Sequence, residues 1–191
     1  MAFFSNESQW FWQALGTLIV GASLIALYHQ VRLQRLSGIV DSMEKLTLLW
    51  NSENQLKLRL SVCEKLSKDI NYFGNDTEEL LELFERVGAY VKIGAIPEFA
   101  IWEVFSWYID HYYEISRAGL TELRIHYKDP LLFENFEWLA VKLNNISRRK
   151  NLRSVVINNK SDAEKFLNGE INTARVLLGV EHQEKSKFLS D

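Results

Sequence analysis

Hydrophobic and polar positions divide the chain into one long uncharged run and a remainder in which apolar residues recur at helical spacing. The run spans Trp10 to Tyr28, WFWQALGTLIVGASLIALY, and Arg32 and Arg35 follow it closely. As a helix it would reach about 28 Å, close to the roughly 30 Å hydrocarbon thickness of a bilayer. Aromatic rings lie at both ends, as is typical where a span meets the two membrane interfaces. The pattern predicts a transmembrane helix at residues 10–28.

The charges around this run predict its orientation. The leader, residues 1–9, contains no Lys or Arg, whereas two arginines follow the span. By the positive-inside rule the leader lies outside and the C-terminal bulk lies in the cytoplasm, here of a bacterial inner membrane. The single cysteine, Cys63, agrees with a reducing compartment. A leader without basic residues or an obvious A-x-A site favours a retained anchor over a cleaved signal peptide.

Apolar spacing beyond the span indicates helices. Steps of three and four predict a helical stalk over residues 29–55, continuous with the anchor to about Trp50. Residues 56–62 alternate as a strand would but also fit a helix, and their context favours a helix. Two prolines and nine glycines leave few breaks in 191 residues. The expected fold class is all-α: an N-terminal transmembrane helix continuing into the stalk, a cytoplasmic helical bundle at residues 56–181, and a flexible tail at 182–191.

Capping signals predict where the first helices of the bundle begin and end. Asp76 and Glu79 have the spacing of a capping box, and the apolar face that follows them runs up to Gly94. A second helix is expected to start after Pro97, because proline favours the first helical turn.

Two further helices are predicted by similar signals. Asp129 and Pro130 form an expected cap and first turn for a third helix. Ser161 and Glu164 form a capping box for a last helix, which is expected to stop at Gly179.

Aromatic side chains surround most of the helix that follows Pro97, from Trp102 to Tyr113. This density places the helix at the centre of the bundle, and core packing is favoured over an aromatic ligand cage. Asp110 and His111 are expected to face solvent or to bind the neighbouring tyrosine hydroxyls.

Three short motifs resemble those of a known group of proteins. They are F-E-x-x-G (Phe84, Glu85, Gly88), K-x-G-x-I (Lys92, Gly94, Ile96) and D-P followed by F-E-W-L (Asp129, Pro130, Phe136, Glu137, Trp138, Leu139). Over roughly residues 70–145 the chain resembles bacterial membrane-anchored proteins of a domain-of-unknown-function family, in which a first transmembrane helix precedes an all-helical domain. The resemblance implies fold and location and brings no activity.

Three polar residues form a candidate network between helices: Glu85, Arg124 and Glu137. Both carboxylates lie beside apolar stripes, and one guanidinium can satisfy two carboxylates in a defined geometry. A structural network that sets helix register is favoured over an acid–base site built from paired carboxylates. The four histidines and Cys63 show no metal-ligand spacing, so no metal and no cofactor are expected.

One spacing resembles a catalytic signature. Arg175 and His182 form an R-x6-H pattern similar to that of HEPN-type ribonucleases, in which two such motifs meet across a dimer and act on an RNA phosphate. Val176 replaces the polar residue that often follows the arginine, and Gly179 interrupts the helix between the pair. No Gly-rich phosphate loop or nucleophile elbow accompanies the pattern.

The strongest cluster of charge is a basic patch at Arg148, Arg149, Lys150 and Arg153, with Lys142 one or two turns earlier. Cations at a helix C-terminus complement the helix dipole, which is the structural interpretation. The functional alternative is attraction to anionic lipid or to a nucleic-acid phosphate.

Small and polar residues share one face of the predicted span: Gln13, Gly16, Thr17 and Gly21. Such a face lets two membrane helices approach closely and share hydrogen bonds, which predicts a homo-oligomer. An isolated span that happens to contain small residues is the alternative.

Two classes of function stay open from the sequence. Composition is that of an ordinary globular protein with an anchor, with a formal net charge of -3, and no catalytic motif or small-molecule substrate is evident. The favoured class is a non-enzymatic, self-associating membrane effector or interaction protein, acting in a stress or defence response. The alternative is an anchored HEPN-like RNA- or nucleotide-binding effector or ribonuclease, whose function His182→Ala would abolish.

Overall fold

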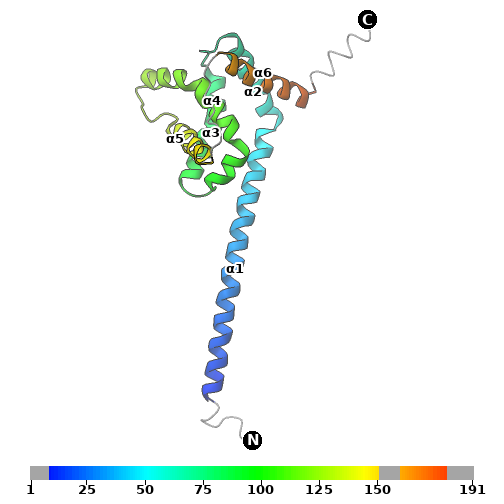
Figure 1. Cartoon of the computed structure of the whole chain (residues 1–191), viewed down its shortest axis with the longest axis vertical. Helices are drawn as coiled ribbons and strands as arrows, with labels where there is room; N and C mark the ends of the chain where they lie inside the picture. The colour runs from blue at the N-terminus through cyan, green and yellow to red at the C-terminus, as the bar shows by residue number, and fades with distance from the viewer. Residues whose placement is uncertain (1–8, 151–159, 180–191) are drawn as a thin grey trace, which may run out of the picture. The chain divides into compact units, whose positions relative to one another are not determined.

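The computed structural model describes residues 9–150 and 160–179, and over these it contains six helices and no strand (Figure 1). They are α1 (Gln9–Trp50), α2 (Glu53–Lys68), α3 (Asn75–Lys92), α4 (Glu98–Tyr127), α5 (Glu134–Arg149) and α6 (Lys160–Leu177). The expected all-α class is confirmed. The chain divides into two units between Ser42 and Met43.

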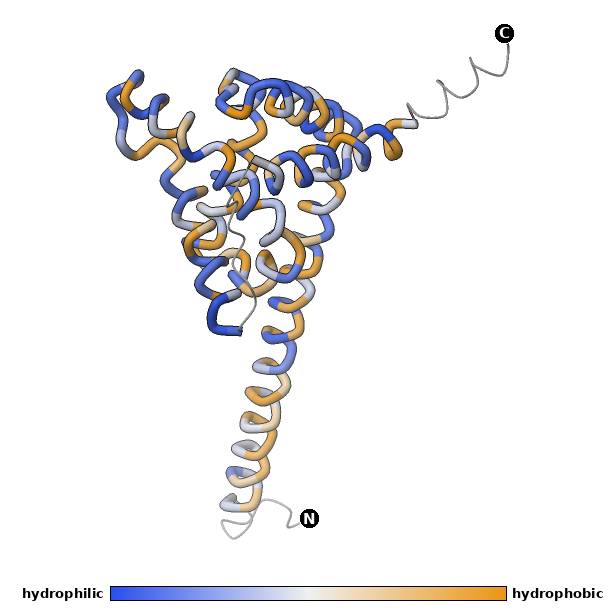
Figure 2. The backbone as a smooth tube through the Cα atoms, turned by 45° about the horizontal axis from the view of Figure 1, so that its top comes forward, coloured by the Kyte–Doolittle hydropathy of each residue, from blue (hydrophilic) through white to orange (hydrophobic). Residues whose placement is uncertain are grey.

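Helix α1 is unbroken from Gln9 to Trp50, as expected for an anchor that continues into a stalk. Among the described residues it is the one helix long and apolar enough to cross a membrane, and none of its most apolar stretch is buried. In Figure 2 the first part of α1 is mostly orange to white, the colours of apolar and neutral residues.

The second unit is a bundle built around α4 and α5. Helix α5 packs against α3 and α4, while α2 pairs with α6 and also contacts α3. Residues 56–62 lie in α2, which confirms the preference for a helix over a strand in this segment. Helical spacing of apolar residues explains the core, since the following residues at such spacing are buried: Leu80, Leu83, Phe84, Val87 and Val91 of α3, Leu139 and Leu143 of α5, and Leu167, Ile171 and Ala174 of α6.

The expected helix ends are found where glycine permits a left-handed backbone. Helix α3 stops before Gly94, with φ of 74°, and α6 stops before Gly179, with φ of 71°. Helix α4 follows Pro97, and α6 begins at Lys160, one residue before the expected cap Ser161.

The expected capping box at Asp76 and Glu79 is wrong. Gly74 is the N-cap of α3, and Asp76 lies inside the first turn. Its carboxylate accepts hydrogen bonds from the Tyr72 hydroxyl at 2.8 Å and from Lys65 Nζ at 2.7 Å. The Asp76 side chain, which the sequence pattern placed at the N-cap of the helix, therefore binds the preceding loop and α2 instead.

The expected start of the third bundle helix at Asp129 and Pro130 is also wrong. Helix α5 begins only at Glu134, after a turn. Asp129 Oδ1 instead accepts the Leu131 backbone N–H at 2.9 Å, a local turn contact that competes with helix capping.

Candidate functional site

Of the predicted polar network, the structure brings Arg124 and Glu137 together. Arg124 Nη1 lies 2.8 Å from Glu137 Oε2, and Arg124 Nε donates to the Leu132 carbonyl oxygen at 2.9 Å. The Tyr113 hydroxyl donates to the same carboxylate at 3.0 Å. Burial opposes ionisation of Glu137, but the hydrogen bonds from Arg124 and Tyr113 outweigh it and lower the pKa of Glu137. This ionised carboxylate joins α4 to α5.

Glu85 contacts neither of these residues and instead caps the N-terminus of α5. Its Oε2 accepts the Phe136 backbone N–H at 2.7 Å, and its Oε1 accepts Asn135 Nδ2 at 2.7 Å. A side chain added at Gly88, one turn along α3, would clash with the Asn135 backbone. The F-E-x-x-G segment thus provides a remote helix cap and the space in which α5 docks.

The expectation that Asp110 faces solvent or binds a tyrosine hydroxyl is wrong, whereas His111 is half-buried. Asp110 is buried among α4 and α5 residues, with 6% of its surface exposed. The His111 ring stacks on Phe166 at 4.6 Å, and its Nδ1 lies 2.6 Å from the Trp107 carbonyl oxygen. Burial lowers the pKa of His111, so the neutral ring is favoured.

A buried ionic cluster, missed by the sequence analysis, joins four helices. Arg59 of α2 donates to Glu170 Oε2 of α6 from Nε at 2.9 Å and from Nη2 at 2.7 Å, and the Tyr112 hydroxyl donates to the same oxygen at 3.0 Å. The guanidinium lies 4.0 Å from the ring centre of Trp50, at the end of α1. Arg59 and Glu170 are 1% and 3% exposed.

A sequence signal for this cluster existed. Arg59 lies within the apolar stripe of α2, between Leu56 and Cys63, and Glu170 lies beside Ile171 in the stripe of α6. A charged residue inside an apolar stripe indicates a buried partner, although the stripe does not say which residue that partner is.

Of the two residues of the R-x6-H pattern, the structure describes Arg175. Arg175 Nη2 pairs with Glu64 Oε1 at 2.7 Å on the surface between α6 and α2. His182 lies outside the described residues. No group of acidic, histidine or cysteine side chains that could hold a metal ion occurs within the described ranges.

One residue of the basic patch, Lys150, contacts aromatic and acidic side chains of α4. Lys150 Nζ lies 3.8 Å from the ring centre of Trp102, 4.5 Å from that of Phe99, and 3.7 Å from Glu103 Oε1. Lys142, one or two turns earlier, pairs with Glu98 at 3.1 Å. Arg148 and Arg149 are exposed at the end of α5, and Arg153 lies outside the described residues.

On the predicted membrane face, Thr17 and Gly21 line a shallow groove together with Ala14, Leu18, Ala22 and Ile25. The Thr17 hydroxyl donates to the Gln13 carbonyl oxygen at 2.9 Å, so its proton is satisfied within the helix. A side chain added at Gly16 or Gly21 would meet no atom within 4 Å. Packing within the chain therefore does not require glycine at either position.

Comparison with protein-family models, with curated proteins and with solved structures finds no match to this chain. The family indicated by the F-E-x-x-G and F-E-W-L motifs therefore remains a resemblance. The roles found for Glu85 and Gly88 rest on the contacts described above.

Proposed function

We propose that this chain is a single-pass protein of a bacterial inner membrane that self-associates through its anchor and acts as a non-enzymatic interaction or effector protein. Residues 10–28 cross the membrane with the N-terminus outside, and the helical bundle works in the cytoplasm. The length and apolar character of α1 and the arginines that follow the run support this arrangement.

The observation that supports self-association is the unfilled face of α1. Glycine in a helix interior costs roughly 0.5–1 kcal/mol relative to alanine, yet Gly16 and Gly21 accommodate no neighbouring group of their own chain. In a membrane, such positions allow a second helix to approach closely. Because the Thr17 hydroxyl proton is bonded internally, close packing rather than a Thr17 donor drives the association.

Replacement of Gly21 by leucine tests this proposal. The full-length protein purified in mild detergent should be an oligomer by light scattering, and Gly21→Leu should reduce it toward a monomer because the added side chain fills the groove. Ser23→Leu is the matched control, since it adds bulk to the same span on the opposite side of the helix. A monomeric parent protein, or an unchanged oligomer in Gly21→Leu, would contradict self-association through this face.

The bundle supports a binding role over a catalytic one. Its sequence-predicted polar residues hold helices together, as Glu85 does for α5 and as Arg124 and Glu137 do for α4 and α5. A membrane-permeabilising response to stress or infection is the activity to test, and Gly21→Leu should abolish it together with assembly.

A further inference from the structure

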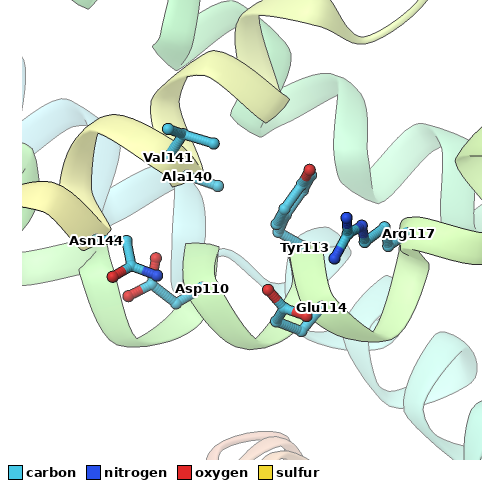
Figure 3. A pocket seen from close by; sticks show the side chains of 7 residues that line it. All are labelled: Asp110, Tyr113, Glu114, Arg117, Ala140, Val141 and Asn144. Carbon is cyan, nitrogen blue, oxygen red and sulfur yellow. The ribbon is translucent and has the colours of Figure 1, made fainter. Parts of the chain in front are cut away.

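A small polar pocket lies between α4 and α5. Its volume is about 170 Å³, and it is lined on α4 by Asp110, Glu114 and Arg117, among others, and on α5 by Asn144 (Figure 3). A space of this size holds on the order of five water molecules or one small organic molecule.

Asp110 lies in this pocket without a partner. It is 6% exposed and makes no hydrogen bond or ion pair with any residue that the structure describes. Burial, and then the negative charge of Glu114 one turn away, raise the pKa of Asp110 to about 7. A carboxylate in so buried a position without a donor from the protein is costly, and the pocket leaves this carboxylate open to a ligand.

The opposite wall, on α5, contributes one polar side chain, the Asn144 amide, which has donors on Nδ2 and an acceptor at Oδ1. Asn144 Oδ1 is buried without a hydrogen-bond partner among the described residues. The other α5 residues at the pocket, Ala140 and Val141, are apolar and uncharged. Figure 3 shows the Asp110 and Asn144 side chains side by side, with Glu114 and Arg117 farther along the same pocket.

The Asp110 carboxylate, with the Glu114 carboxylate one turn away, favours a ligand that supplies hydrogen-bond donors and positive charge. A primary ammonium group has three donors on one compact cation and suits such a carboxylate. A divalent metal ion is disfavoured, because no cluster of three ligating side chains exists in the described ranges.

We propose that this pocket binds a small molecule through a primary ammonium group, which donates hydrogen bonds to the Asp110 carboxylate. Glu114 adds a second negative charge, and Arg117 supplies donors for a polar or anionic group at the other end of the ligand. This site does not depend on self-association through α1.

Calorimetric titration of the full-length protein in detergent at pH 8 tests the proposal with three probes: ethylammonium, putrescine and glycine. At least one should bind saturably, whereas tetramethylammonium, which has the charge but no N–H donor, should not. Binding should weaken at pH 6, where Asp110 takes up a proton. The other titratable groups that line the pocket are Glu114, Arg117 and Tyr113, all on α4, and α5 contributes no titratable group to the lining. Binding of glycine alone would assign Arg117 to the carboxylate, and Arg117→Gln should then remove it.

Asp110→Asn should weaken binding about tenfold or more, because it removes the charge with little change in shape. Glu122→Gln, an exposed charge on the same helix, is the matched control and should bind as the parent protein does. If Asp110→Asn fails to fold, Glu114→Gln removes the second negative charge of the pocket and should weaken binding likewise. No saturable binding of any probe, or equal binding by parent and Asp110→Asn, would overturn the proposal and leave a pocket filled only with water.

Discussion

Buried polar side chains define the chemistry of this protein at the scale of single residues. Cys63 and Tyr112 lie in the core, with Sγ 3.3 Å from the tyrosine hydroxyl oxygen, and burial raises the pKa of the Cys63 thiol to about 12. The thiolate is the reactive form of cysteine, so this thiol is protected in the folded state.

Cys63 should therefore report unfolding. At pH 8 a maleimide should label the folded full-length protein only at the rate at which the bundle opens, and it should label the denatured protein stoichiometrically at once. The chain has one cysteine, so the mass increase measured by mass spectrometry reports labelling of Cys63 alone. Prompt labelling of the native protein would show that Cys63 is accessible.

Gly88 should tolerate no side chain, because a Cβ there would press on the Asn135 backbone. We expect Gly88→Ala to lower the free energy of unfolding by about 1–3 kcal/mol. Gly169→Ala, in an exposed helical position with no atom within 4 Å, is the control and should stabilise by about 0.5–1 kcal/mol. Thermal unfolding followed by circular dichroism measures both changes, and equal stability of the two variants would argue against tight docking of α5 at Gly88.

Asp110 should make stability fall as pH rises. The pKa of Asp110 is about 7 in the folded protein, against an ordinary value of 3.8 that applies to the unfolded chain. Between pH 3.8 and pH 7 the folded state therefore keeps a proton that the unfolded state has lost. The resulting loss of stability from pH 4 to pH 7.5 is at most about 4 kcal/mol. Asp110→Asn removes this contribution, and its melting temperature relative to the parent protein should rise with pH. A difference in melting temperature between Asp110→Asn and the parent protein that does not vary with pH would mean that burial of the Asp110 carboxylate does not destabilise the folded protein.

At the scale of elements, α6 is attached to α2 by two ion pairs of different character. Arg59 and Glu170 are buried, whereas Glu64 and Arg175 are about half exposed. Removing one partner of a buried pair leaves an uncompensated charge, while exposed pairs contribute little.

Glu170→Ala should therefore destabilise the bundle by about 3–5 kcal/mol, and Arg175→Ala, on the same helix, by less than about 1 kcal/mol. The double variant Arg59→Met with Glu170→Leu should recover much of the loss, because it leaves no charge buried. Chemical denaturation of the three variants in detergent measures these differences. Similar losses in Glu170→Ala and Arg175→Ala would refute the central role of the buried pair.

At the scale of the whole molecule, the described residues contain one helix long and apolar enough to cross a membrane, and a separate unit provides a packed helical core. The proposed topology follows from the charges on either side of the span. The bundle should then be reachable only from the cytoplasmic side.

Cell fractionation tests this topology. The protein expressed in a bacterial host should resist extraction by alkaline carbonate and be released by detergent. Protease added to intact spheroplasts should leave the bundle whole, and the same protease should digest it after lysis. Release by carbonate, or digestion in intact spheroplasts, would contradict the anchor or its orientation respectively.

Local signals account for the parts of the fold that were predictable. The helices, the long run of α1 and the stops at Gly94 and Gly179 depend on propensity and on contacts within a few residues. The caps at Asp76 and Asp129 were mispredicted because each carboxylate binds another donor: Asp76 accepts from Tyr72, and Asp129 accepts the Leu131 N–H in a local turn.

By itself, the sequence determined that this protein is helical, that its first helix is apolar enough for a membrane, and where several helices end. Only the tertiary structure decided that Glu85 caps a helix about fifty residues later, that Arg59 meets Glu170, and that Asp110 lies unpaired in a pocket. The reason is physical: apolar periodicity shows which face of a helix is buried, but a buried polar group is defined by the partner that packing places against it.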